Sequence, residues 1–134
     1  MDLHLFKFMT RRRILLFDQE EDLVWPLESV LEGDTIVHIE RPDQVEQELA
    51  TNKYGLVLAE PYTISGGEAE RGRRASVIKT IGKQGVPVIM FTTQDTESLN
   101  LLGLTPGIDY KGHIPKPFEL TQVRTAVDQH YQEQ

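Results

Sequence analysis

The sequence predicts an α/β protein in which a parallel five-stranded sheet is covered by helices on both faces. Short apolar runs alternate with amphipathic stretches along the chain, which is the order expected of repeated strand–helix units. Three of the runs are apolar throughout, as is typical of strands that are buried on both faces. Right-handed crossovers between successive strands then make the sheet parallel. The 134 residues fit one domain of ordinary size.

Five apolar runs are the candidate strands. The first, third and fourth are continuous, and the last is the weakest. They lie at residues 14–17, 35–39, 56–59, 86–91 and 110–114.

Amphipathic stretches separate and follow these strands. Leu23, Leu27, Val30 and Leu31 share one helical face, at spacings i, i+4, i+7 and i+8. Pro26 fits that helix only if it begins near residue 22 or 23, because proline is tolerated in the first turn. Four further helices are indicated. The second contains Pro42, Val45 and Leu49, and the third contains Ala75, Ile78 and Ile81 and ends at Gly82 or Gly85. The fourth contains Leu99 and Leu102, and the fifth contains Leu120, Val123 and Val127 and runs to about His130.

Composition excludes several kinds of site and partner. The chain has no cysteine, which excludes disulfides, thiolate metal sites and cysteine nucleophiles and suits a cytoplasmic protein. Its formal net charge of −7 argues against binding nucleic acid or anionic membranes. No apolar run approaches the roughly 20 residues needed to span a bilayer. The four histidines are scattered, without the spacing of metal ligands.

Residues 1–12 are expected to be a lead-in to one domain that spans residues 13–131. The apolar residues of this segment are broken by His4 and Lys7, and its basic run follows them. That order is wrong for a secretory signal, which begins with its charges. We interpret the segment as a loose lead-in or a short extra element.

Polar side chains stand where the predicted strands end. In an open parallel sheet the functional crevice lies beyond the carboxyl ends of the strands, so these side chains should converge there. They are Asp18, Gln19 and Glu20 after the first strand, Glu60 after the third, Thr92 after the fourth and Lys116 after the fifth. The connection at residues 61–67 exceeds the usual length of about 2 to 6 residues, which marks it as a place to look for function.

Three motifs at these positions resemble those of bacterial response-regulator receiver domains, the CheY-like family. They are ILLFDQE at the first strand, PVIMFTT at the fourth and KPFEL at the last helix. The resemblance covers residues 13–131 and implies a flavodoxin-like fold with strand order 2-1-3-4-5 and five helices. In that family two acids after the first strand bind Mg²⁺, and an aspartate ending the third strand accepts a phosphoryl group. A hydroxyl after the fourth strand and a lysine before a proline contact that group.

Carried over position by position, the resemblance assigns three residues directly. Asp18 matches the first metal-binding acid, Thr92 the hydroxyl and Lys116 the lysine. The Lys116–Pro117 bond matches one that is often cis in the family, and cis X–Pro bonds are otherwise uncommon.

Three positions depart from the family pattern. Glu60 stands where the phosphate-accepting aspartate belongs, and Gln19 stands where the second metal-binding acid belongs. His113 takes the place of the switch aromatic, three residues before the lysine, while Tyr110 lies six residues before it. The segment at residues 107–116 is about two residues longer than is usual in the family.

These departures predict a site that accepts phosphate poorly. Mg²⁺ requires near-octahedral oxygen ligation with one or two carboxylates, and Gln19 removes a charge while Glu20 should point to a different side. The extra methylene of Glu60 moves its carboxylate further into the crevice, and such misplacement can cost about a hundredfold in rate. We therefore expect no cofactor, with Mg²⁺ bound weakly if at all. The longer side chain should instead pair with Lys116 or Thr92 and hold the site without phosphate.

Each of these residues also has a purely structural interpretation. Glu60 could cap a loop or helix, and Lys116 could simply neutralise Asp18. Thr92 or Thr93 could be the N-cap of the fourth helix.

The basic run at residues 71–74 is interpreted as a solvated first turn or two of the third helix. Glu68 and Glu70 nearby supply compensating charge. An overall charge of −7 and the lack of interleaved aromatic residues argue against a nucleic-acid site here.

The leading functional interpretation is a phosphorylation-impaired receiver domain that acts by binding and is not an enzyme. The resemblance implies a contact face made by the fourth helix, fifth strand and fifth helix, including Leu101, Leu102, His113 and residues 119–130. A protein partner or a second copy would bind there, and a histidine kinase or a fused output domain is the implied class of partner. Two alternatives stay open: a phosphorylation-competent receiver, and another flavodoxin-like protein such as a flavin binder. The acidic stretch after the first strand argues against the phosphate cradle that a flavin would need.

Overall fold

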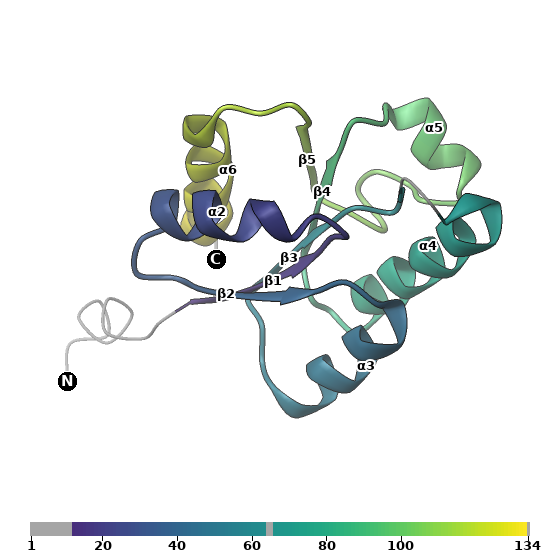
Figure 1. Cartoon of the computed structure of the whole chain (residues 1–134), viewed down its shortest axis with the longest axis horizontal. Coiled ribbons are helices and arrows are strands. Elements are labelled where there is room, and N and C mark those ends of the chain that lie inside the picture. The colour runs from purple at the N-terminus through teal and green to yellow at the C-terminus, as the bar shows by residue number, and fades with distance from the viewer. Residues whose placement is uncertain (1–11, 64–65, 134) are drawn as a thin grey trace.

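The computed structural model describes residues 12–63 and 66–133, and these form the predicted doubly wound α/β architecture (Figure 1). One sheet of five parallel strands has the order β2-β1-β3-β4-β5, which confirms the expected topology. The strands are β1 (Arg13–Phe17), β2 (Thr35–Ile39), β3 (Leu56–Ala59), β4 (Val88–Thr92) and β5 (Gly112–Pro115). Of the predicted lead-in, residues 1–11 lie outside the described residues.

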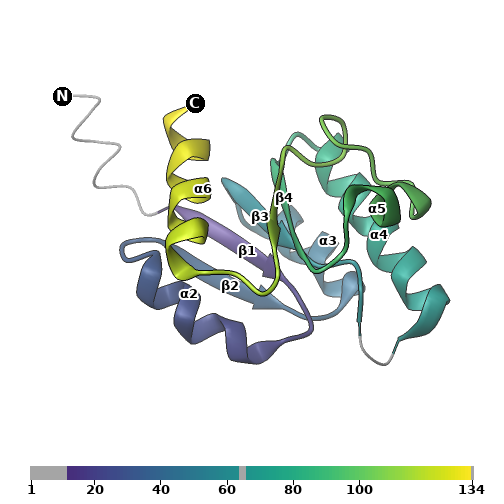
Figure 2. The same ribbon diagram turned by 90° about the horizontal axis from the view of Figure 1, so that it is seen from above.

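In the described part of the chain, five α-helices cover the sheet, and a 3-10 turn, η1 (Glu21–Leu23), precedes the first of them. The α-helices are α2 (Val24–Val30), α3 (Pro42–Thr51), α4 (Gly67–Lys83), α5 (Thr96–Leu101) and α6 (Leu120–Gln132). Figures 1 and 2 show α2 and α6 on one face of the sheet and α3, α4 and α5 on the other. Within the described residues, none of these helices has the length and apolar character needed to cross a membrane.

Two hydrophobic layers follow from the alternation of side chains along the strands. Ile14 and Leu16 of β1 face the layer under α2 and α6, whereas Leu15 and Phe17 face the layer under α3, α4 and α5. All residues of β3 and β4 are buried, so these strands read as continuous apolar runs. β5 is an edge strand with only Ile114 buried, which explains its weak signal in the sequence.

The helix ends agree with the local sequence signals, with two differences. Pro42 is the first residue of α3, and Pro26 lies in the first turn of α2, where its missing N–H costs no helical hydrogen bond. α4 begins at Gly67, well before its apolar residues. The N-cap of α5 is Asp95, whose side chain accepts a hydrogen bond from the Ser98 N–H, so neither Thr92 nor Thr93 caps that helix.

Candidate functional site

The parallel register brings four of the predicted site residues to one edge of the sheet. Phe17 is paired with Ala59, and the Glu60 N–H extends that ladder by donating to the Phe17 carbonyl at 2.9 Å. On the other side, the Lys116 N–H donates to the Thr92 carbonyl at 3.1 Å. Asp18, Glu60 and Lys116 therefore directly follow β1, β3 and β5, and Thr92 is the last residue of β4, so their side chains lie at the same edge of the sheet. The Lys116–Pro117 bond is cis, as predicted.

The ammonium group of Lys116 is the centre of this cluster. Its Nζ lies 2.7 Å from Asp18 Oδ2 and 3.4 Å from Glu60 Oε1. It is also 3.9 Å from Glu20 Oε1, so the expectation that Glu20 points to a different side is wrong. The Lys116 side chain is only 8% exposed, so water screens these contacts weakly. Lys116 does neutralise Asp18, but it contacts Glu60 as well.

Glu60 is buried and held by several groups at once. Its Oε2 accepts a hydrogen bond from the Tyr62 N–H at 3.3 Å, and the nearby Thr92 hydroxyl acts to lower the pKa of this carboxyl group. Burial raises the pKa of Glu60, while the bond to Thr92 and the charge of Lys116 oppose that rise. The local contact with Tyr62 is the loop-capping role considered above, but the contacts with Thr92 and Lys116 join separate strands.

Both carboxylate oxygens of Asp18 are engaged within the protein. Oδ1 accepts from the Glu20 N–H at 2.8 Å, and Oδ2 accepts from Lys116. The Asp18 backbone is also fixed, because its carbonyl oxygen lies 2.7 Å from His38 Nε2 of β2. This carboxylate is almost completely buried.

The site does not fit the Mg²⁺ ion that the receiver resemblance implies. Gln19 is exposed and supplies no charge, and the two buried carboxylates share the ammonium of Lys116. In residues 12–63 and 66–133, no three His, Cys, Asp or Glu side chains are arranged to hold a metal ion. A Mg²⁺ ion needs several oxygen ligands at short distances in near-octahedral positions. Here the ammonium of Lys116 neutralises the negative charge of the carboxylates that would attract the ion.

The predicted switch residues lie apart from the acidic cluster. His113 is exposed on β5, and its Nε2 lies 3.2 Å from the carbonyl oxygen of Thr92 rather than from its hydroxyl. The Thr92 hydroxyl oxygen accepts a bond from the Gln94 N–H at 3.2 Å. Tyr110 is buried in the layer under α4, and its hydroxyl has no hydrogen-bond partner. Tyr110 therefore does not belong to the site.

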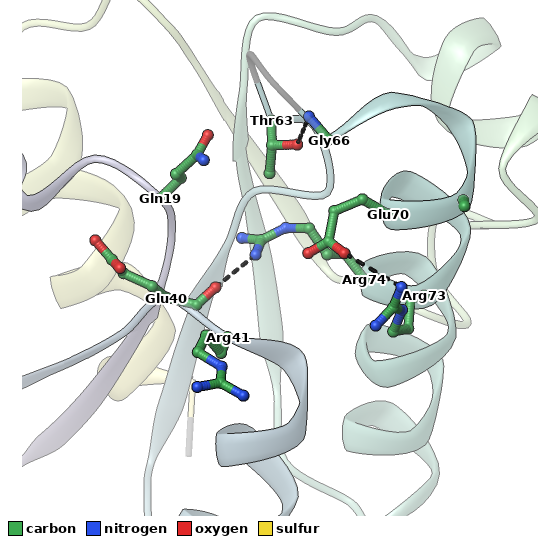
Figure 3. Close-up of a pocket in the computed structure, with 9 residues that line it drawn as sticks. Gln19, Glu40, Arg41, Thr63, Gly66, Glu70, Arg73 and Arg74 are labelled. Carbon is green, nitrogen blue, oxygen red and sulfur yellow. Dashed lines mark hydrogen bonds and ion pairs between the residues drawn. The ribbon is translucent and has the colours of Figure 1, made fainter.

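Arg74 is the residue that the sequence analysis missed, and the prediction that it is solvated is wrong. Only 1% of Arg74 is exposed. Its Nε and Nη2 donate to the Glu60 carbonyl at 3.0 and 2.9 Å. Its Nη1 donates to the Glu40 carbonyl at 2.6 Å (Figure 3). Its guanidinium carbon lies 4.0 Å from the centroid of the Phe17 ring. Burial lowers the pKa of Arg74.

A signal for Arg74 is present in the helical periodicity. Positions 74, 77, 78 and 81 share one face of a helix, at spacings i, i+3, i+4 and i+7, and the last three are apolar. Arg74 is on this buried face, whereas Arg73 is exposed and pairs with Glu70 at 3.7 Å.

A polar hollow of about 320 Å³ lies beside the cluster, between the starts of α3 and α4 (Figure 3). Positively and negatively charged side chains surround this hollow, and Arg74 is one of the residues that line it. The lining residues are Gln19, Glu40, Arg41, Thr63, Gly66, Ala69, Glu70, Arg73 and Arg74. Gln19 thus borders this hollow, one residue away from the carboxylate of Asp18.

Comparison with solved structures shows that the same fold occurs in receiver domains. The signal receiver domain of an HD domain-containing protein from Pseudomonas fluorescens Pf-5 superimposes with a TM-score of 0.72 at 20% identity, covering 92% of this chain and 88% of that one. A two-component response regulator from Clostridium difficile gives 0.73 at 20% identity, covering 91% and 97%. The chemotaxis protein CheY4 of Vibrio cholerae gives 0.71 at 12% identity, covering 90% and 98%.

At the level of sequence, the chain matches no protein-family model and no curated protein. The relationship therefore lies in the fold, at identities of 20% or less for these three structures. The sheet order, the covering helices and the similarity over about nine tenths of the chain together show that this protein has the flavodoxin-like fold of response-regulator receiver domains.

Proposed function

We propose that this chain is a signalling receiver domain that is impaired in phosphorylation and acts by binding other proteins in the cytoplasm. The observation that carries the proposal is the 3.4 Å contact of Lys116 Nζ with Glu60 Oε1. In the resemblance, that lysine is the group that contacts the phosphoryl oxygens. Here the carboxylate of Glu60 pairs with the positive charge of that lysine.

The chemistry of phosphoryl transfer supports this proposal. The transfer needs an in-line acceptor and cations that neutralise the charge on the transferred oxygens. Glu60 engages both the lysine and the Thr92 hydroxyl, and the residues present do not fit Mg²⁺. The acceptor therefore competes with an incoming phosphoryl group for the groups that would stabilise it.

Glu60 holds the site as an internal anion, and it copies a phosphate only in part. A carboxylate carries one negative charge, whereas a phosphate carries about two and has more acceptor oxygens. The Thr92 hydroxyl acts to lower the pKa of Glu60, and His113 is exposed. The proposal is accordingly a site that Glu60 holds without phosphate.

The proposed contact surface is the face of α5, β5 and α6. Leu101 of α5 is 85% exposed, and Leu120 at the start of α6 is 40% exposed. These two side chains supply exposed apolar surface on this face, beside the exposed His113 of β5. The proposed occupant is a protein of the same signalling system, such as a histidine kinase or an output domain, or a second copy of the chain.

The binding of beryllofluoride with Mg²⁺, a mimic of the phosphoryl group, tests the site. Amide NMR spectra of the unaltered chain should not change when the mimic is added. The double variant Gln19→Asp with Glu60→Asp restores both acids of the family pattern and should show shifts around Asp18 and Thr92. Glu40→Asp, the same shortening beside the site, is the matched control and should behave as the unaltered chain. Saturable shifts in the unaltered chain would contradict the proposal.

A second experiment tests the contact surface. If the chain forms a homodimer through this face, Leu101→Glu should raise its dissociation constant in analytical ultracentrifugation, because the substitution buries a charge in the contact. Ser76→Glu adds the same charge on the exposed side of α4 and should leave association unchanged. Equal effects of the two substitutions would place the contact elsewhere.

A further inference from the structure

An exposed tryptophan marks a second surface of the molecule, on α2. Trp25 is the only tryptophan of the chain, and 77% of it is exposed. Tryptophan is highly buried on average, so this degree of exposure is unusual. α2 lies on the face of the sheet opposite α3, α4 and α5 (Figure 1).

The hydrophobic core does not use Trp25. α2 packs on the sheet through the face that carries Leu23, Leu27, Val30 and Leu31, and these residues belong to the layer under α2 and α6. Trp25 lies on the other side of the helix, midway in sequence between Leu23 and Leu27. Because tryptophan is among the residues that contribute most to protein interfaces, this position indicates a contact with another molecule.

Four acids share the exposed side of η1 and α2 with this tryptophan. Glu21 and Asp22 precede Trp25 by four and three residues, and Glu28 and Glu32 follow it by three and seven. These are the spacings of one helical face, and all four acids are exposed. The five residues together are called the acid–tryptophan stripe below.

The negative charge of the stripe is not neutralised by the chain. Residues 14–40 contain no lysine or arginine. Among residues 12–63 and 66–133, the ion pairs on this side of the molecule use Asp34 and Asp128, which share Arg12, and none uses an acid of the stripe. A partner that covers the stripe should therefore carry positive charge.

The combination of charge and tryptophan narrows the class of partner. In the described part of the chain, no three acids lie close enough to hold a metal ion. Nucleic acids and anionic membranes carry the same sign of charge as the stripe, so both are repelled. The partner must supply an apolar surface for Trp25 as well as positive charge, which a basic amphipathic segment of a protein does.

A second copy of the chain fits this requirement poorly. The chain has a net charge of −7, so two copies repel each other. Its basic run on α4 is engaged within its own fold. Arg73 pairs with Glu70, Arg74 is buried, and the guanidinium carbon of Arg71 lies 5.0 Å from the centroid of the Tyr62 ring.

We propose that the acid–tryptophan stripe is a docking surface for a basic amphipathic segment of another protein. Apolar side chains of that segment cover Trp25, and its lysine or arginine side chains pair with the acids on either side. The proposal is independent of the proposed function, because it involves neither Glu60 and Lys116 nor the face of α5, β5 and α6.

A synthetic peptide tests the apolar part of the contact. The probe is a fluorescently labelled amphipathic helix of leucine and lysine, about 18 residues or five turns long, whose Kd is measured by fluorescence anisotropy. Trp25→Ser should raise this Kd at least about tenfold. Ile108→Ser is the control, because Ile108 is 78% exposed in the loop between α5 and β5, and it should leave the Kd unchanged. The same peptide with serine in place of leucine should bind weakly to the unaltered chain.

The charged part of the contact needs its own pair of variants. Glu28→Lys with Glu32→Lys should raise the Kd more than about tenfold and weaken its dependence on salt, which screens exposed charges. Glu46→Lys with Glu97→Lys changes the net charge equally, at exposed acids of α3 and α5, and should have a much smaller effect. Circular dichroism should show the same fold for all variants, since every substituted residue is exposed. Amide NMR shifts caused by the peptide should lie in residues 21–32.

Three results would overturn the proposal. The first is that the leucine–lysine peptide does not bind. The second is an equal effect of the two charge-reversal pairs, or of Trp25→Ser and Ile108→Ser, which would reduce the binding to attraction by overall charge. The third is self-association of the unaltered chain in analytical ultracentrifugation that Trp25→Ser abolishes, which would assign the stripe to a second copy.

Discussion

At the scale of single residues, the site depends on one lysine that serves two buried acids. The Lys116 ammonium contacts both Asp18 and Glu60, and all three side chains are less than a tenth exposed. A buried charge that loses its partner is far more costly than an exposed one. Lys116 therefore stabilises the folded chain, whatever its role in signalling.

Replacement of this lysine should destabilise the protein strongly. Lys116→Met leaves two buried carboxylates without their cation, and breaking such a pair costs about 3 to 5 kcal/mol. Urea unfolding at neutral pH should show a loss of this size, and acid should reduce it by protonating Glu60, whose pKa burial already raises. Lys53→Met removes an exposed charge and should change stability by less than about 0.5 kcal/mol. Similar losses for the two variants would refute this account of Lys116.

A second buried group, at the opposite edge of the sheet, should make stability depend on pH. His130 Nε2 lies 3.0 Å from the Gly55 carbonyl, and its Nδ1 lies 2.7 Å from Lys111 Nζ, so the ring donates to the first and accepts from the second. Burial and the Lys111 charge lower the pKa of His130 below 6.5, while the Gly55 carbonyl opposes that change.

The direction of the effect follows from proton linkage. Below pH 6.5 the unfolded chain binds a proton at this histidine before the folded chain does. The contribution of His130 to the free energy of unfolding should therefore be fully present above pH 6.5. It should be lost as the pH falls from 6.5 through the lowered pKa of the folded chain. Lys111→Met removes the repelling charge, so an NMR titration should find the pKa of His130 higher than in the unaltered chain. An unchanged or lower pKa in the variant would contradict this explanation.

At the scale of elements, Arg74 connects three parts of the fold. It lies on α4 and donates to carbonyls at the ends of β3 and β2, and it packs on Phe17 of β1. The position of Glu60 thus depends on α4 as well as on its own strand. Two of these hydrogen bonds are accepted by the carbonyl of Glu60, the residue that directly follows β3.

Loss of this connection should be measurable against the neighbouring arginine. Arg74→Met leaves the carbonyls of Glu60 and Glu40 without donors, and hydrogen bonds to charged groups contribute about 1.5 to 3 kcal/mol each. We expect Arg74→Met to lower the free energy of unfolding by about 3 kcal/mol or more. Arg73→Met breaks only an exposed ion pair and should cost less than about 1 kcal/mol. Equal costs for the two variants would mean that Arg74 is not the connection described.

Comparison of elements shows where sequence reasoning succeeds and where it stops. β1, β3 and β4 were predicted because buried parallel strands are apolar throughout. The helix starts just before Pro26 and at Pro42 follow from the missing N–H of proline. The acidic cluster could be predicted as well, because strand order determines which strand ends meet.

The contacts that were missed depend on side-chain length and on three-dimensional neighbours. Glu20 reaches Lys116 through its own flexible side chain, which a rule about strand faces does not describe. Arg74 was assigned to the solvent by its charge, although its helical position is on the apolar face. The helical periodicity places Arg74 on the buried face, but only the fold shows which carbonyl groups accept its hydrogen bonds.

At the scale of the whole molecule, the fold of a receiver is combined with a site that its own residues occupy. The architecture matches that of solved receiver domains over about nine tenths of the chain. The acidic edge, however, has a glutamate in place of the acceptor aspartate and a glutamine in place of an acid, and its lysine is shared between two carboxylates. Under the proposed function, this protein keeps the receiver fold without its phosphoryl chemistry, since one fold can host several functions.

The central proposal is that this receiver fold is impaired in accepting phosphate, and the most direct test is intact-mass spectrometry after incubation with acetyl phosphate and Mg²⁺. The unaltered chain should keep its mass. The double variant Gln19→Asp with Glu60→Asp, treated in the same way, shows whether the method detects an acyl phosphate on this fold. A stable species of the unaltered chain that is heavier by one phosphoryl group, with the group located on Glu60 or Asp18, would contradict the account.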